Sequence, residues 1–228
     1  MSVDAAFLSR VGRSILIATL MSLFLLITGC SQAPTTQGVP WWVSSPGAPL
    51  PQGFPLPGPL DEVVIKQYPA YRAAVNRADA SSTSPGNLFF PLFNHIEENH
   101  ISMSAPVELS YPKNAEGAKG RSDAMESMAF IYGTPQTGKP GADGKVTVVD
   151  VPPMTVASIA LAGDYDAEHF QKGRDLLMAW LKQHADAYEA VGEARYLAYN
   201  SPFTLPFTRL GEAQIAVRAK VPTAGSRP

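Results

Sequence analysis

The chain has 228 residues, a formal net charge of −2 at neutral pH and 45% hydrophobic residues. It holds no basic run and no zinc-ligand spacing, so it lacks the electrostatic footprint of a nucleic-acid-binding protein. Its single cysteine, Cys30, excludes an internal disulfide. The residues beyond the N-terminal leader suffice for one domain with a substantial core.

The leader, residues 1–29, is typical of an export signal. Arg10 and Arg13 precede an apolar run over residues 15–27 that is shorter than the ~20 residues needed to span a bilayer. The run ends in Ile-Thr-Gly-Cys, an order that looks like a bacterial lipobox. Cleavage before Cys30 would leave that cysteine lipidated. The alternative is an uncleaved membrane anchor in which the cysteine is incidental.

A lipidated Cys30 predicts a protein of the bacterial cell envelope. Ser31 follows the cysteine, and by resemblance to enterobacterial lipoproteins a residue other than Asp there points to the outer membrane, facing the periplasm. The membrane is therefore an expected partner, reached through the lipid on Cys30.

Residues 30–60 are rich in proline, which predicts an extended polyproline-like tether rather than a packed segment. Trp41 and Trp42 stand out within it. Their rings suit the lipid interface near an acylated end, and the alternative is that they lie back on the domain.

A folded domain is predicted over residues 61–221, with a flexible tail at 222–228. Residues 62–68 and 71–77 read as short strands separated by Pro69. The stretch from Asn87 to Glu108 places apolar residues at helical spacing in its first half. From Ile101 it alternates with the two-residue period of a half-buried strand.

Further strands are predicted after that stretch, and a second helix begins at the N-cap Asp166. The predicted strands are 124–132, 145–151, 154–161, 193–200 and 213–221, and the helix runs to about His184. Gly133 to Lys139 matches most of a phosphate-binding loop. Pro140 replaces the Ser or Thr that would bind magnesium, and a strand follows instead of a helix, so nucleotide binding is rejected. Two helices and about eight short strands predict an α+β fold with a curved, mainly antiparallel sheet.

Two sequence landmarks carry a family resemblance. The segment from Ile101 to Val107, Ile-Ser-Met-Ser-Ala-Pro-Val, resembles the Ile-x-Met-Thr-Ala-Pro-Val strand of the SOUL haem-binding family. Tyr199-Asn200-Ser-Pro, followed by Arg209-x-x-Glu212, is similar to the ending of that family, with Gly211 where Asn is usual. The resemblance implies a distorted antiparallel β-barrel with two α-helices, built from a repeated half that is similar to the effector-binding domains of transcription regulators.

The resemblance also implies a ligand, haem or a related tetrapyrrole, in an apolar groove beside the first helix. Haem needs apolar walls, a cation for its propionates and, in some proteins, an iron ligand. His95 and His100 are candidate iron ligands, although each could instead be a satisfied or solvated histidine, and Met103 is either a third candidate or packed inside. Arg209 is the candidate cation, with Lys113 as another. The candidate walls are Phe89, Leu92, Phe93, Ile96, Phe203 and Phe207, together with Leu88.

No catalytic motif of a known hydrolase or zinc enzyme is present, so the protein is predicted not to be an enzyme, with a weak activity on a tetrapyrrole as the alternative. The spacing of His95 and His100 is five, off the four-residue spacing that would aim both at one zinc ion. The sequence predicts a lipid-anchored protein that binds haem for carriage, buffering or sensing. The alternative is a non-enzymatic interaction or structural lipoprotein whose groove takes another hydrophobic ligand or a protein segment.

Overall fold

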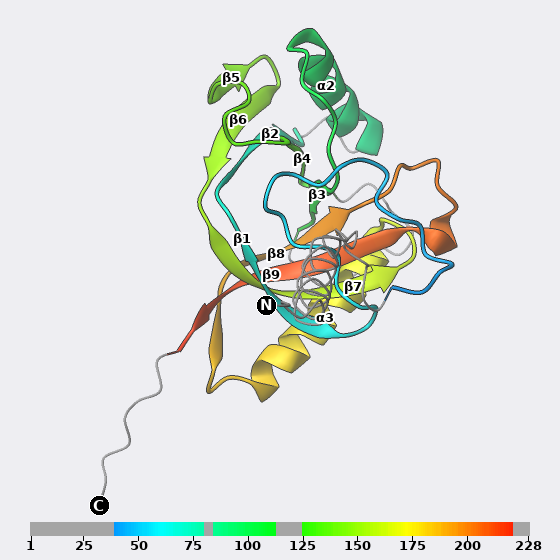
Figure 1. Ribbon diagram of the computed structural model, residues 1–228, viewed down its shortest axis with the longest axis vertical. Helices are drawn as coiled ribbons and strands as arrows, with labels where there is room; N and C mark the ends of the chain where they lie inside the picture. The colour runs from blue at the N-terminus through cyan, green and yellow to red at the C-terminus, as the bar shows by residue number, and fades with distance from the viewer. Residues whose placement is uncertain (1–38, 80–83, 113–124, 221–228) are drawn as a thin grey trace, which may run out of the picture. The chain divides into compact units, whose positions relative to one another are not determined.

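The computed structural model describes residues 39–79, 84–112 and 125–220 (Figure 1). Cys30, the signal segment, Lys113 and the tail at 222–228 lie outside the described residues. The helices are α2 (Pro85–Glu98) and α3 (Ala167–Gln183), and η1 (Pro206–Thr208) is a short 3-10 turn. The strands are β1 (Val63–Tyr68), β2 (Tyr71–Arg77), β3 (Val107–Ser110), β4 (Ser127–Ile131), β5 (Gly141–Asp143), β6 (Val146–Val151), β7 (Met154–Ala162), β8 (Tyr188–Ala198) and β9 (Leu210–Ala219). Within the described ranges, no helix is long and apolar enough to cross a bilayer.

The strands form one antiparallel sheet in the order β1-β7-β9-β8-β3-β4-β2-β6-β5. Two units with the same connection make up this order. One is β2, α2, β3 and β4, the other is β7, α3, β8 and β9, and in each the last strand lies between the other two. The units meet where β3 pairs with β8. The predicted α+β fold with a distorted, repeated sheet is confirmed. The sheet is open, because β1 and β5 are its unpaired edges among the described strands.

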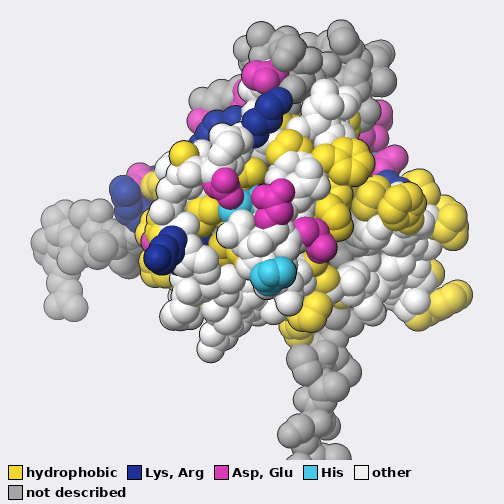
Figure 2. Space-filling view, turned by 90° about the horizontal axis from the view of Figure 1, so that it is seen from above, with side chains coloured by type: hydrophobic (Ala, Val, Ile, Leu, Met, Phe, Trp, Pro, Cys, Tyr) yellow, Lys and Arg dark blue, Asp and Glu magenta, His cyan; other side chains and the backbone are white. Residues whose placement is uncertain are grey.

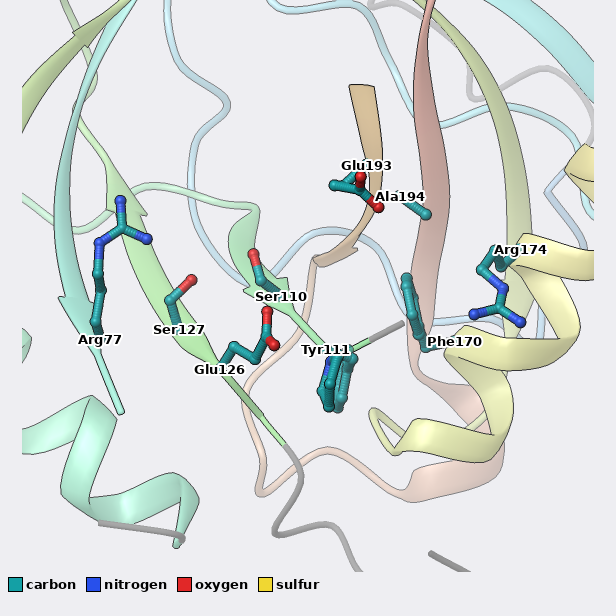
Figure 3. Close-up of a pocket in the computed structure, with 10 residues that line it drawn as sticks. Arg77, Ser110, Tyr111, Glu126, Ser127, Phe170, Arg174, Glu193 and Ala194 are labelled. Atoms are coloured by element: carbon teal, nitrogen blue, oxygen red, sulfur yellow. The ribbon is translucent and has the colours of Figure 1, made fainter. Parts of the chain in front are cut away.

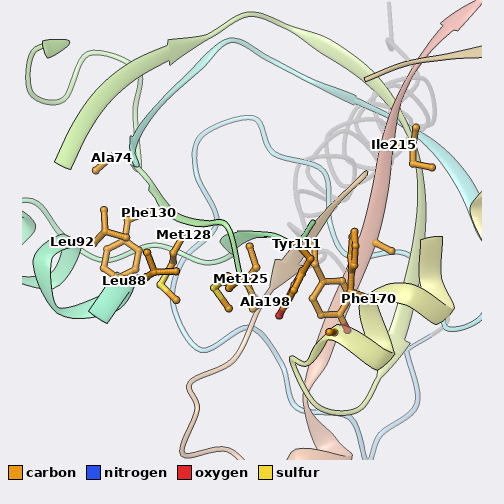
Figure 4. Close-up of a cluster of buried hydrophobic side chains, with 14 of the residues drawn as sticks. Ala74, Leu88, Leu92, Tyr111, Met125, Met128, Phe130, Phe170, Ala198 and Ile215 are labelled. Atoms are coloured by element: carbon orange, nitrogen blue, oxygen red, sulfur yellow. The ribbon is translucent and has the colours of Figure 1, made fainter. Parts of the chain in front are cut away.

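Both faces of the sheet are buried, which follows from the alternation of side chains along each strand. On one face lie the helices, and Tyr196 and Ile215 contribute to a core that runs from α2 to α3. Figure 4 shows this core as one belt, with Phe130 near α2 and Phe170 on α3. The neighbouring residue Leu197 points to the other face, into a second cluster.

That second face is covered by the proline-rich segment ahead of β1. Val43 is buried with Leu197 and Tyr199, and Leu50 and Phe54 pack against the same cluster. The prediction that the tether is unpacked is therefore wrong from residue 39 onward. Proline removes backbone donors but leaves an apolar surface, so an extended proline-rich chain can cover a sheet face that alternation has made apolar. The start of the folded domain at residue 61 stays a prediction.

The helix predicted around Asn87 is α2, with Leu88 and Leu92 fully buried against the sheet. The strand predicted to start at Ile101 is wrong, because β3 starts only at Val107. Pro106 has no N–H for a ladder, and Ala105 N–H donates instead to Pro49 C=O (3.0 Å).

The Ser within the Ile-x-Met-Ser-Ala-Pro-Val landmark has a structural task. The buried hydroxyl of Ser104 donates to the backbone carbonyl of Ile131 on β4. Because Thr would carry the same hydroxyl, the departure from the family pattern keeps the bond.

The start of α3 is confirmed as predicted. Asp166 is the N-cap, and its carboxylate accepts the backbone N–H of His169 at 2.8 Å. Three other boundaries differ. The hairpin β5–β6 begins between the predicted strands 124–132 and 145–151, and β8 and β9 each begin before the predicted residue. Gly141 at the start of β5 and Gly144 in the hairpin turn both have positive φ, and glycines of this kind are typical of turns rather than strands.

The second family landmark holds the two faces together. Glu212 is fully buried on β9 and pairs with Lys66 of β1. Its carboxylate also accepts the N–H of Gly58 (2.7 Å) and the hydroxyl of Tyr199 (2.9 Å). One buried carboxylate thus joins the proline-rich segment, β1 and β9.

Gly211, which replaces the family's usual Asn, has a neighbour that explains it. A Cβ at this position would overlap the ring and hydroxyl of Tyr196, which is fully buried. The Tyr196 hydroxyl has no hydrogen-bond partner among the described residues. The side chain of Tyr196 therefore occupies the space that a residue larger than glycine at position 211 would need.

Candidate functional site

The main cavity lies where the two repeated units meet and has a volume of about 590 Å³. Its walls come from the ends of β2, β3 and β4 on one side and from α3 and β8 on the other, as Figure 3 shows. Its size falls within the ~300–1,000 Å³ of small-molecule sites. The lining residues are Arg77, Ser110, Tyr111, Pro112, Glu126, Ser127, Phe170, Arg174, Glu193 and Ala194.

Stacked aromatic rings form the apolar part of the cavity. The rings of Tyr111 and Phe170 stack at 4.9 Å between centroids with 24° between planes. The hydroxyl of Tyr111 donates to the backbone carbonyl of Tyr165 (3.1 Å). Burial, reinforced by the carboxylates of Asp166 and Asp164, holds the pKa of Tyr111 far above its usual range. Tyr111 is therefore a neutral phenol at physiological pH, and its ring is a fixed apolar surface.

Charged side chains form the rest of the cavity. Figure 3 shows Arg77 and Arg174 on opposite sides of the cavity, with Glu126 between Ser127 and Tyr111 and Glu193 at the upper edge of the view. Glu193 lies where the register of β8 with β9 shifts, between Ala190 and Ala194. An irregularity in the pairing takes side chains out of the regular alternation, and here a carboxylate lines the cavity. The arrangement suits a flat apolar ligand that carries anionic groups, with room for a cationic group as well.

A second, smaller hollow of about 450 Å³ lies between α2 and the β5–β6 hairpin, and it contains His95. His95 is buried, and both ring nitrogens have partners: Nδ1 lies 2.7 Å from Asp143 and Nε2 lies 2.8 Å from the Tyr132 hydroxyl. The ionised carboxylate of Asp143 can only accept, so Nδ1–H donates to it, and burial raises the pKa of Tyr132 to about 12, which keeps its phenol protonated beside Nε2. In this arrangement His95 links α2 to the hairpin. An iron ion could take Nε2 only by displacing Tyr132.

The structure does not bring the other predicted ligands to His95. His100 is exposed beyond the end of α2 with a positive φ of 54°, and it lines neither cavity. Met103 is also exposed, so the expectation that it packs inside is wrong. The cause is the missing strand at 101–106, since without a ladder the alternation does not turn Met103 toward the core.

The predicted walls separate into two groups. Leu92 and Ile96 are buried in the core with Leu88, and Phe89 packs against that core with its ring beside Phe130 (5.3 Å). Phe93 is partly exposed, and Phe203 and Phe207 protrude from the loop before β9. None of the residues predicted as walls lines either cavity.

The guanidinium of Arg209, the predicted cation for the propionates, already binds groups of its own loop and of the nearby Asp164. Its guanidinium pairs with Asp164 and donates to the backbone carbonyls of Pro202 and Thr204. It also lies over the ring of Tyr165 at 5.6 Å. Arg209 therefore shapes the loop between β8 and β9.

The residues that line the main cavity were not singled out from the sequence. Phe170 was assigned to the buried stripe of α3, which is correct, and its place at the edge of a cavity depends on the junction with β3. Arg77 carried only the signal of a cation at the end of β2, and Arg174 that of a cation on the polar face of α3. That signal is common on any surface, so it does not distinguish a site.

The residues of the main cavity fit haem as a flat dicarboxylate. The stacked pair offers an apolar surface, and the two guanidinium groups match carboxylate geometry. No His, Cys or Met is among the described residues that line this cavity. The described parts of the chain also hold no cluster of three His, Cys, Asp or Glu side chains that could bind a metal ion.

The fold and the cavity define an α+β protein with a ligand-sized cavity at the junction of two repeated units. The model of the SOUL heme-binding protein family matches residues 55–216, and the chain belongs to this family. Membership supports haem as a ligand at the level of the family. No curated protein matches the chain.

Solved structures share the fold at low identity. The C-terminal domain of EcmrR has a TM-score of 0.53 at 16% identity, covering 69% of this chain and 97% of that one. EcmrR in a complex with DNA gives 0.53 at 17% identity over 70% of this chain, which spans 58% of the EcmrR chain. A hydrolase from Listeria innocua gives 0.51 at 9% identity, covering 71% and 94% of the two chains. These likenesses concern the fold alone.

Proposed function

We propose that this protein is a lipid-anchored cell-envelope protein that binds haem or a related tetrapyrrole in the main cavity, for carriage, buffering or sensing. The observation that carries the proposal is the cavity at the junction of the two units, with stacked aromatic rings between two arginines. Family membership supplies the class of ligand. The proposed haem site is the main cavity and no longer the groove beside α2 that the sequence predicted. In that groove both ring nitrogens of His95 already have hydrogen-bond partners.

The roles of the cavity residues follow from their chemistry. Tyr111 and Phe170 form the apolar wall against which the macrocycle packs. Arg77 and Arg174 bind its propionates, and Arg174 also lies 3.4 Å from the carboxylate of Asp175. Bound haem would supply an iron centre and its redox chemistry. Because no His, Cys or Met is among the described lining residues, we propose that hydrophobic and ionic contacts hold the ligand. The protein then has no enzymatic role in this proposal.

A haemin titration of the chain from Ser31 to Pro228, followed by Soret absorbance, tests the cavity. We expect saturable binding, and we expect iron-free protoporphyrin to bind with similar affinity because iron is not ligated by histidine. The Arg77→Ala/Arg174→Ala variant should bind about tenfold more weakly, since two partly exposed charge-assisted contacts together amount to roughly 1.4 kcal/mol.

Two matched controls accompany the titration. Arg218→Ala removes an exposed arginine on β9 that pairs with Glu189 far from the cavity lining, and it should leave the affinity unchanged. His95→Gln should leave the Soret band unchanged. Loss of the band in the His95 variant alone would move the site to the groove beside α2. Absence of saturable binding would favour the second candidate, an interaction lipoprotein whose cavity takes another hydrophobic ligand or a protein segment.

Lipid anchoring through Cys30 is the second part of the proposal. The lipobox-like order Ile-Thr-Gly-Cys supports it, and Ser31 supports the outer membrane, facing the periplasm. Mass spectrometry of the protein extracted from membranes should show an N-terminal Cys30 carrying acyl chains. Cys30→Ser should release the protein from the membrane fraction or leave it unprocessed. A mature N-terminus elsewhere, without lipid, would contradict the anchor.

A further inference from the structure

Exposed apolar side chains gather on the loop before β9 and on the proline-rich segment. Trp41 and Phe203 are each 95% exposed, Phe207 is 67% exposed, Leu205 is 60% exposed and Trp42 is 42% exposed. We call these five residues the apolar edge. Of the two alternatives for the tryptophans, lying back on the domain is wrong for Trp41. Large apolar side chains in one exposed group mark a contact surface.

Hydrogen bonds hold the two segments of the apolar edge side by side. The backbone N–H of Ser44 donates to Thr208 C=O (2.8 Å), and the two hydroxyls lie 3.0 Å apart. The side-chain amide of Asn200 donates to the carbonyl of Ser45 (2.6 Å). Figure 1 shows the blue and orange segments running together, and Figure 2 shows hydrophobic side chains protruding on the same side. The apolar edge is thus fixed by the fold and needs no ordering before contact.

The two segments that form the apolar edge contain no charged residues. Residues 31–60 contain no Asp, Glu, Lys or Arg, and neither do residues 199–208. The next residue, Arg209, is paired with Asp164 and turned into its own loop. A surface without cations gains nothing from anionic lipid, and one without carboxylates is not repelled by it. Its chemistry matches the neutral boundary between headgroups and acyl chains, where Trp side chains are enriched.

The position of Cys30 indicates that the membrane is the partner of the apolar edge. Trp41 follows Cys30 by 11 residues, a span of at most ~40 Å when fully extended. A lipid on Cys30 would therefore keep the apolar edge within reach of the bilayer that holds it. Acyl chains on Cys30 would hold the chain at the membrane without orienting the domain, so a second contact orients the attachment.

We propose that the apolar edge inserts into the interface of the membrane that carries the anchor and fixes the orientation of the domain on it. The proposal rests on the lipid anchoring proposed above only for how the domain reaches the membrane. Insertion itself needs no acyl chain and no haem.

Vesicle binding by the unacylated chain, Ser31 to Pro228, tests the apolar edge. The hydrophobic clusters on both faces of the sheet, as far as the structure describes them, consist of residues that this chain retains. We expect it to co-sediment with phosphatidylcholine vesicles, with little dependence on salt or on added anionic lipid. Tryptophan emission should shift to the blue and be quenched by brominated acyl chains. Trp180, which stacks on His184 at 4.0 Å, should not respond.

The variant Trp41→Ser/Phe203→Ser/Phe207→Ser should lower the partition coefficient at least about tenfold, because burial of one large apolar side chain contributes more than tenfold by itself. The matched control is Phe90→Ser, which removes a ring that is as exposed as Phe207 but lies on α2. Phe90→Ser should partition like the wild type. All these side chains are exposed, so thermal melts of the variants should coincide with that of the wild type.

Several results would overturn the proposal. One is a wild-type chain that ignores neutral vesicles or needs anionic lipid. Another is an equal loss in the Phe90→Ser control. A third is a wild-type dimer that the triple variant dissociates without any vesicle binding, which would make the apolar edge a contact between two copies. The unacylated chain separates these results from a failure of Cys30 lipidation, and omission of haemin separates them from a failure of the cavity.

Discussion

Replacing Lys66 by Met lowers the free energy of unfolding by about 3–5 kcal/mol, because it leaves the carboxylate of Glu212 buried without its cation. Lys66 is buried and Glu212 has no exposed surface. The remaining partners of Glu212, among them Gly58 N–H and the Tyr199 hydroxyl, are dipoles that cannot neutralise a charge. Urea denaturation monitored by circular dichroism measures the loss as a lower midpoint.

A second variant separates the buried charge from lost packing. Lys66→Met/Glu212→Gln removes both charges and keeps hydrogen-bonding atoms at position 212, so it should recover more than half of the lost stability. Arg218→Met breaks an exposed pair with Glu189 and should change stability by less than ~0.5 kcal/mol. If Lys66→Met costs no more than Arg218→Met, the pair contributes little and the network is held by its neutral members.

Leu92→Ala lowers the free energy of unfolding by about 2–5 kcal/mol and leaves haemin affinity unchanged. Leu92 was a predicted wall of a haem groove, and in the structure it is fully buried between α2 and the sheet. The substitution leaves a cavity that the neighbouring strands can fill only in part. Chemical denaturation and a haemin titration of the same preparation measure both quantities.

Phe93→Ala on the same helix is the matched control. Phe93 is 40% exposed and stacks on Phe89 at 5.9 Å, so its loss should cost less than about 1.5 kcal/mol. A weaker haemin affinity in Phe93→Ala, with Leu92→Ala unaffected, would restore the surface of α2 as the haem site. Equal stability losses in the two variants would contradict the packing of α2 described above.

Much of the fold was readable from the sequence, because local patterns and caps act over a few residues. Alternation predicted β1, β2, β6 and β7 within one or two residues, and the Asp166 cap predicted the start of α3. The strand predicted at Ile101 failed for a non-local reason. The backbone N–H of Ala105 donates to Pro49 and the side chain of Ser104 donates to Ile131, partners that no local pattern reveals.

The candidate site was decided by tertiary structure alone. The sequence could name His95 and Arg209 as residues of a type that binds haem. Only the fold showed that His95 instead bonds to Asp143 and Tyr132. The fold likewise committed Arg209 to Asp164. Burial makes a polar group take whatever partner packing brings within reach, and those partners are far away in sequence.

The sequence by itself determined the class of fold and the family, and it predicted an export signal, since each depends on residues that are close together in the chain. Only the tertiary structure decided that Tyr111 of one repeated unit faces Phe170 of the other and that Trp41 lies beside the loop of Phe203. The physical reason is that a cavity and an exposed edge are properties of how two distant segments pack, and the alternation within each segment leaves their pairing undetermined.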